Sequence, residues 1–81
     1  DSRHYLVKGL CSIEDFNTYF GASFSDEEFD TLGGLVTHHF GRLPKSGETL
    51  ALGEFEFQVA RADSRRLAML RVTVSGQPQQ D

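Results

Sequence analysis

The sequence predicts a small α+β domain, a two-layer sandwich in which helices cover one face of a mainly antiparallel sheet. Two stretches in the first half carry apolar residues at spacings of three and four, as amphipathic helices do. The second half instead alternates apolar and polar residues, which is typical of half-buried strands. With 81 residues, the chain has room for one domain and one shallow core. The expected order is strand, helix, short turn, helix and three further strands.

The opening segments predict a strand followed by a helix. Residues 4–8 include a short apolar run that a glycine ends, so we expect a strand there. Ser12 comes next, and its hydroxyl can accept a hydrogen bond from an early backbone N–H of a helix. Apolar residues then recur at helical spacing over 13–20, and Gly21 is a natural C-terminal stop. We therefore expect a helix of about two turns.

A second helix is predicted over 32–40. Either Asp30 or Thr31 can cap its start, and Gly41 can end it. Its apolar spacing predicts one face that is turned toward the core. The residues of this face are Leu32, Leu35, Val36, His39 and Phe40.

The acidic segment between the two helices has two interpretations. Ser25 precedes a glutamate by three residues, which is a capping-box pattern and predicts one short helical turn ending near Phe29. The same carboxylates could attract a hard cation such as Mg²⁺, although the segment lacks the spacing and the glycine of a calcium loop. Capping is favoured, and a cation site is the alternative. The four acidic residues are Asp26, Glu27, Glu28 and Asp30.

The second half predicts three antiparallel strands joined by tight turns. Leu50 and Leu52 alternate with smaller residues, and Gly53-Glu54 is a two-residue hairpin turn with glycine first. The strand after that turn alternates cleanly, with an inward face formed by Phe55, Phe57 and Val59.

The last strand is expected over 66–74 and is apolar on both faces for part of its length. Leu70, Val72 and Val74 share one face, whereas Leu67 and Met69 lie on the other. Either a β-bulge or a partner surface would account for this pattern.

Composition and charge exclude several classes of function. The formal net charge is −4 and the basic residues are scattered, whereas a nucleic-acid binder needs a basic stripe. No apolar run approaches the roughly 20 residues that span a bilayer, so direct membrane insertion is not expected. Cys11 is the single cysteine, so no intramolecular disulfide can form, and this fits a reducing, cytoplasmic location. The seven phenylalanines are expected to supply much of the core volume.

No motif in the chain predicts catalysis. There is no Gly-x-Ser-x-Gly elbow, and Cys11 has no positive neighbour closer than Lys8 to activate it. His38 and His39 are adjacent in a helix, where side chains point about 100° apart and cannot share a metal from one face. A core-edge or solvated role is favoured, and a metal site completed by another segment or subunit is the alternative. Gly33-Gly34 lies inside the helix and not between a strand and a helix, which favours close packing over phosphate binding.

The turn before the last strand combines an aspartate with two arginines. In such a turn the carboxylate of Asp63 usually accepts hydrogen bonds from its own backbone, which favours a structural role for it over catalysis. Arg65 and Arg66 could also bind an anion or a carboxylate of a partner protein.

The most specific stretch of the chain is FDTLGGLV at 29–36, followed by FGRLP at 40–44 and Gly47-Glu48. Together with the opening strand and helix and the closing hairpin, it resembles the transporter-associated CorC/HlyC domain. The resemblance covers 5–74. We assign 1–4 to a linker remnant and 75–81 to a disordered tail, and we expect the chain to be a fragment of a longer protein.

The resemblance implies a C-terminal domain that follows a pair of CBS modules in proteins linked to magnesium and cobalt efflux. It carries over no catalytic residue, so we expect a non-catalytic accessory or regulatory domain that is not an enzyme. The expected partners are the CBS domains of the same parent chain, and a homodimer is a second candidate. The residues expected to contact a partner are Leu67, Met69, Arg71, Arg65 and Arg66.

Two other functions stay open at this point. The fold that the resemblance implies is similar to half of the FAD-binding module of certain oxidoreductases, which makes FAD or an adenine nucleotide an alternative ligand. No resident cofactor is otherwise expected. Sensing of divalent cations by the acidic segment is the other alternative.

Overall fold

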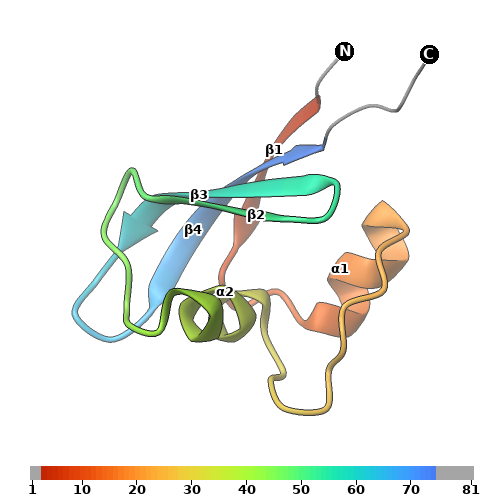
Figure 1. The fold of residues 1–81 in the computed structure, drawn as a ribbon, viewed down its shortest axis with the longest axis horizontal. Coiled ribbons are helices and arrows are strands. Elements are labelled where there is room, and N and C mark those ends of the chain that lie inside the picture. The colour runs from red at the N-terminus through yellow and green to blue at the C-terminus, as the bar shows by residue number, and fades with distance from the viewer. Residues whose placement is uncertain (1–2, 75–81) are drawn as a thin grey trace.

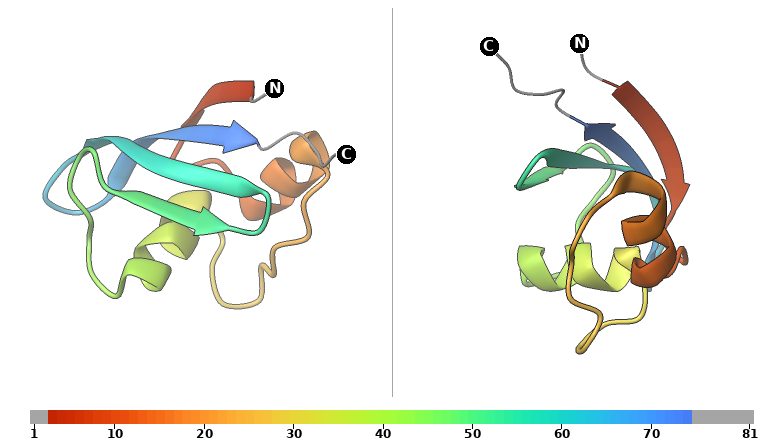
Figure 2. Two further views of the ribbon diagram at one scale, coloured as in Figure 1. Left: turned by 45° about the horizontal axis from the view of Figure 1, so that its top comes forward. Right: turned by 90° about the vertical axis from the view of Figure 1, so that its right-hand side faces the viewer.

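The computed structural model describes residues 3–74 and shows a single four-stranded sheet with two helices on one side of it (Figure 1). The strands are antiparallel throughout, and they lie side by side in the order β1-β4-β3-β2. Figure 2 shows that both helices lie below the sheet and leave its other face uncovered. The predicted α+β sandwich is confirmed. Its elements are β1 (Arg3–Lys8), α1 (Ile13–Phe20), α2 (Leu32–Phe40), β2 (Thr49–Leu52), β3 (Phe55–Ala62) and β4 (Leu67–Val74).

The ends of the domain differ slightly from the assigned bounds. Arg3 and His4, which we assigned to a linker remnant, form the first two residues of β1. The disordered tail predicted at 75–81 lies outside the described residues.

The ends of α1 form as their capping residues predict. Ser12 has an extended backbone, and its hydroxyl accepts a hydrogen bond from the Asp15 N–H at 3.0 Å. Gly21 adopts a left-handed conformation with φ of 68°, and its N–H donates to the Asn17 carbonyl.

The start of α2 is capped by Thr31, whose hydroxyl accepts from the Gly34 N–H at 3.1 Å. Of the face predicted to turn inward, Leu32, Leu35 and Val36 are buried and Phe40 is partly buried. His39 is exposed, so the buried face of α2 is narrower at its last turn than the apolar spacing predicted.

The short helical turn expected to start after Ser25 and to end near Phe29 does not form. The Ser25 hydroxyl accepts from the Glu27 N–H at 3.3 Å, two residues along the chain and not three, so no capping box is made. Asn17 holds the segment in another way, because its side-chain amide donates to the Phe24 carbonyl at 2.8 Å and accepts from the Phe24 N–H at 3.1 Å. Both bonds fix the backbone at Phe24, directly before Ser25.

The pairing of β3 with β4 contains the irregularity that the last strand's apolar pattern suggested. The register shifts on either side of Arg61, which lies opposite Met69. As a result, Leu67 turns to the core side together with Leu70, and it is 2% exposed. The expectation that Leu67 shares a face with Met69 was therefore wrong, because strict alternation does not hold across the shift.

Aliphatic side chains supply more of the core than the composition suggested. Among residues 3–74, ten apolar side chains besides Pro44 are buried, and two of these ten, Phe16 and Phe57, are phenylalanines. The other five phenylalanines are partly buried around this cluster. The ring of Phe16 lies 4.4 Å from that of Phe20 and 5.4 Å from that of Phe55, measured between centroids. Full burial of one such ring contributes about 1.5–3 kcal/mol.

Three backbone segments meet at Gly9, directly after β1. Its N–H donates to the Ala68 carbonyl at 2.9 Å, and its own carbonyl accepts from the Gly33 N–H at 2.9 Å. A β-carbon at Gly9 would lie 1.9 Å from the Leu67 carbonyl oxygen, and one at Gly33 would lie 3.0 Å from the Gly9 carbonyl oxygen. The close packing that we expected of the helical glycines is confirmed for Gly33, whose neighbour is the backbone that leaves β1.

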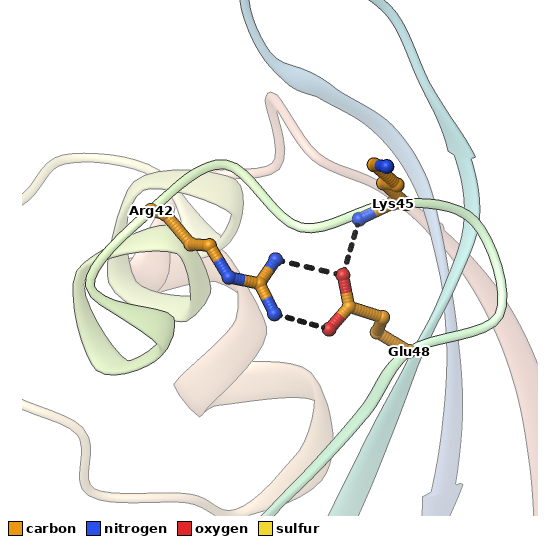
Figure 3. Close-up of polar contacts among 3 residues, drawn as sticks. All are labelled: Arg42, Lys45 and Glu48. Atoms are coloured by element: carbon orange, nitrogen blue, oxygen red, sulfur yellow. Dashed lines mark hydrogen bonds and ion pairs between the residues drawn. The ribbon is translucent and has the colours of Figure 1, made fainter.

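An ion pair closes the loop between α2 and β2 (Figure 3). The Arg42 guanidinium donates to both carboxylate oxygens of Glu48, at 2.8 and 2.6 Å, and the Lys45 N–H donates to Glu48 Oε2 at 2.8 Å. These hydrogen bonds, that from Arg42 foremost, lower the pKa of Glu48 to about 2. The next part of the chain is tied to β3, because the Val59 N–H donates to the Glu48 carbonyl at 2.9 Å.

The first prediction concerns the junction at Gly9. Gly9→Ala is expected to lower the free energy of unfolding by about 3 kcal/mol, because the new methyl group collides with a backbone oxygen that cannot rotate away. Urea denaturation followed by circular dichroism measures this loss. Gly34→Ala is the matched control, since its β-carbon would lie 3.3 Å from the Thr31 hydroxyl oxygen, which is a side-chain atom. Equal losses in the two variants would contradict the role of Gly9.

The second prediction concerns pH. The pKa of Glu48 is lowered from its ordinary value near 4.5 to about 2, so its contribution to stability is present above pH 4.5 and is lost as the pH falls toward 2. Thermal unfolding midpoints of the wild type should therefore drop more steeply over this range than those of Glu48→Gln. Asp63, whose pKa is also lowered, titrates in both proteins and cancels in the comparison. Parallel curves would show that the ion pair does not influence folding.

Candidate interaction surface

The face of the sheet that no helix covers presents three rows of neighbouring side chains. In the central row, Leu6 of β1 lies opposite Arg71 of β4, and Arg71 lies opposite Gln58 of β3. We name this surface the open face. Its side chains are His4, Leu6 and Lys8 of β1, Met69, Arg71 and Thr73 of β4, Glu56, Gln58 and Arg61 of β3, and Thr49 and Ala51 of β2. The His4 imidazole and the Thr73 hydroxyl lie 3.1 Å apart, as expected for two side chains on one face.

The open face is cationic although the chain as a whole is acidic. Lys8, Arg61 and Arg71 are exposed on it, and Glu56 is the one carboxylate among its side chains. Within residues 3–74 the Arg42–Glu48 pair is the only salt bridge, so none of these three cations is neutralised there. The surface therefore suits a partner that carries carboxylates.

The residues predicted to contact a partner are divided by the structure. Met69 is partly buried between Lys8 and Arg61 in one row, and Arg71 is exposed in the central row. Leu67 belongs to the core, so we no longer include it in a contact surface. Sequence reasoning missed Leu6 and Lys8, because their membership of this face depends on the pairing of the first strand with the last.

The turn between β3 and β4 displays the two remaining arginines. One carboxylate oxygen of Asp63 accepts from the backbone N–H groups of Arg65 and Arg66, at 2.7 and 2.9 Å. These bonds lower the pKa of Asp63, and they confirm that the carboxylate organises the turn. The arginine side chains are exposed and line a hollow of about 460 Å³ beside the start of α2.

The glycine pair beside this hollow offers no backbone donor to a ligand. The Gly33 N–H donates to the Gly9 carbonyl at 2.9 Å, and the Gly34 N–H donates to the Thr31 hydroxyl at 3.1 Å. The Leu32 N–H donates to the Cys11 carbonyl at 2.8 Å, and that of Leu35 donates to the Thr31 carbonyl at 3.1 Å. Because a phosphate cradle needs such N–H groups, close packing explains Gly33-Gly34 better than nucleotide binding does.

The acidic segment lies in the loop between the helices. Its members Asp26, Glu27, Glu28 and Asp30 are all exposed. Across the described part of the chain, no three histidine, cysteine, aspartate or glutamate side chains lie together in a way that could hold a metal ion. His38 and His39 are exposed as well, with ring centroids 5.7 Å apart.

The single thiol is in an environment that opposes its ionisation. Burial raises the pKa of Cys11, and the negative charge of Asp15 raises it further. A thiol of this kind is a poor nucleophile near neutral pH.

Both helices of the described chain are much shorter than a bilayer crossing requires, with eight residues in α1 and nine in α2.

Comparison with known proteins supports the resemblance seen in the sequence. The model of the CorC/HlyC family, described as a transporter-associated domain, matches residues 1–76. The magnesium and cobalt efflux protein CorC of Escherichia coli K12 is 52% identical over 84 aligned positions, which cover 99% of this chain and 29% of that protein. The chain therefore spans about three tenths of the length of this relative.

Solved structures show the same fold. The region associated with the Mg²⁺ and Co²⁺ transporter CorC from Neisseria meningitidis MC58 is 46% identical, with a TM-score of 0.86 and 91% of each chain covered. A CorC/HlyC domain from a Xylella fastidiosa Temecula1 hemolysin, solved in complex with Mg²⁺ and Mn²⁺, is 25% identical, with a TM-score of 0.80. That match covers 90% of this chain and 89% of the other. Since the family model spans nearly the whole sequence and the fold agrees, the chain belongs to the CorC/HlyC family of transporter-associated domains.

Proposed function

We propose that this domain is a non-catalytic, cytoplasmic regulatory part of a magnesium and cobalt efflux protein, and that it acts by docking its open face on another part of that protein. The observation that carries the proposal is a sheet face with no helix over it, on which three cations make no salt bridge within residues 3–74. The relation to CorC, a magnesium and cobalt efflux protein, supplies the process in which the docking would act.

The chemistry of the open face suits a protein surface with carboxylates. Leu6 is 60% exposed and Met69 is partly buried, so apolar area lies between the charged groups. Arginine and methionine are enriched at protein interfaces, where a guanidinium can bind a carboxylate through two hydrogen bonds. The CBS domains of the parent chain are the partner that we propose, and a second copy of the chain is the alternative.

Regulation requires that docking differs between two states of the parent protein. A domain that bound both states equally would shift neither, however tightly it bound. The proposal is therefore that the open face contacts its partner in one transport state and releases it, wholly or in part, in the other.

The third prediction tests the open face by reversal of one charge at its centre. Arg71→Glu is expected to weaken association with the separately produced remainder of the parent protein by about tenfold, and Met69→Glu combined with it by more. Isothermal titration calorimetry measures the dissociation constants. Lys45→Glu makes the same charge change on an exposed loop residue outside the open face, and it should leave the affinity unchanged.

Unchanged association in the double variant would overturn the proposal. Sedimentation of the chain alone distinguishes the two proposed partners. If the wild-type chain is a dimer and the Arg71→Glu variant is not, the partner of the open face is a second copy of the chain.

Direct binding of divalent cations is a second candidate function. It is favoured by the Xylella fastidiosa domain, whose structure was solved with Mg²⁺ and Mn²⁺. Calorimetric titration of this chain with each ion tests the candidate. It is supported only if the wild type gives a saturable heat and the variant that combines Asp26→Asn with Glu28→Gln does not. A flat titration at millimolar ion would eliminate it.

A further inference from the structure

An apolar groove is lined by residues of β1 and α1, and β1 forms one edge of the sheet. Its volume is about 870 Å³. The large apolar side chains that are most exposed in this part of the chain all line it: Leu6 at 60%, Leu10 at 63% and Tyr19 at 73%. Such a concentration of exposed apolar side chains marks a binding surface.

Aromatic rings form one wall of the groove. The Phe20 ring lies 4.9 Å from that of Tyr5 and 4.8 Å from that of Tyr19, and both pairs meet edge to face. Tyr5 is on β1 and the other two rings are on α1, so the wall is held by two packed elements. The groove is therefore preformed.

The strand beside the groove has a free hydrogen-bonding edge. The Gly9 N–H donates to the Ala68 carbonyl. In an antiparallel ladder every second residue is hydrogen-bonded to the neighbouring strand, so this bond fixes which residues of β1 are bonded to β4. By this alternation, His4, Leu6 and Lys8 direct their backbone N–H and carbonyl groups away from β4. The Lys8 carbonyl accepts from the Cys11 N–H at 3.0 Å, which leaves the groups of His4 and Leu6 facing outward. In the described chain, β1 pairs with β4 on its other side and ends the sheet.

The charges of β1 indicate what kind of strand could pair with it. The strand reads RHYLVK and carries Arg3, His4 and Lys8 with no acidic residue. A second copy of β1 would bring only further basic side chains to the pairing, and like charges across neighbouring strands are destabilising. A strand with an apolar centre and acidic ends would instead complement both the groove and the edge.

We propose that this groove binds an extended polypeptide segment that adds to β1 as a further strand of the sheet. Alternate apolar side chains of the segment fill the groove beside Leu10 and Tyr19, and its carboxylates lie near Arg3 and Lys8. The main-chain hydrogen bonds are made by His4 and Leu6. This site uses the edge of the sheet, whereas the proposed function uses its open face. Leu6 and Lys8 belong to both surfaces, so the two proposals are tested separately at Leu10, which lines the groove, and at Arg61, which is on the open face.

The fourth prediction uses a model peptide, acetyl-Glu-Val-Thr-Val-Thr-Val-Glu-amide, and the fluorescence of the chain itself. The chain has two tyrosines and no tryptophan, and both tyrosines line the groove. Titration with the peptide should change tyrosine fluorescence in a saturable way and slow amide hydrogen exchange at His4 and Leu6. A peptide with lysine in place of both glutamates should bind about tenfold more weakly.

Two proline variants test the edge on which binding depends. Leu6→Pro removes an outward N–H of β1 and should weaken binding at least about tenfold, because the main-chain bond is lost. Ala51→Pro is the matched control, since Ala51 lies on β2, the other edge strand, one residue before the Leu52–Phe55 pair that flanks a two-residue turn. It should leave peptide binding unchanged. If Leu6→Pro does not fold, Leu10→Ser tests the groove at a mostly exposed side chain and should also weaken binding.

Several results would overturn this proposal. No fluorescence change at millimolar peptide, equal binding of the two peptides, or a loss confined to Ala51→Pro would each do so. A dimer of the chain that Leu6→Pro converts to monomer would show that a second copy occupies the edge. Arg61→Glu separates the two surfaces, because Arg61 is on the open face but two strands away from β1. It should weaken docking to the parent protein and leave peptide binding unchanged.

Discussion

The backbone contact at Gly9 is the constraint on which the arrangement of the domain depends. There the end of β1, the start of β4 and the first turn of α2 approach so closely that one extra methyl group has no space. The two helix starts are joined next to it, because the Ile13 N–H donates to the Asp30 carbonyl at 2.9 Å. Both helices are thereby held on the same side of the sheet, which leaves the other side bare.

One-sided coverage also separates the charges of the molecule. The acidic residues Asp26, Glu27, Glu28 and Asp30 lie on the helix side, in the loop between α1 and α2, whereas Lys8, Arg61 and Arg71 lie on the open face. A domain with its charges separated in this way orients in the electric field of a charged neighbour. An acidic neighbour therefore approaches the open face more readily than the helix side. This favours docking in a defined orientation, which regulation of a larger protein requires.

Local signals in the sequence were sufficient for both helices and the four strands. Ser12 and Gly21 predicted the ends of α1 correctly, and Thr31 is the one of the two caps expected for α2 that forms, because a cap depends on a few neighbouring residues. Features that depend on distant contacts were not predictable. The short turn expected after Ser25 did not form, and the register shift beside Arg61 moved Leu67 into the core. Membership of the open face needed the β1–β4 pairing, which joins opposite ends of the chain.

The pairing of Arg3 with Val74 places the entry and exit points of the folded chain side by side on neighbouring strands. A covalent tether at either point therefore holds the domain by the same corner. Rotation about that corner would displace the opposite end of β4, where the Asp63–Arg66 turn lies, more than the corner itself. A change of angle at the attachment would therefore become a displacement of the arginines in this turn.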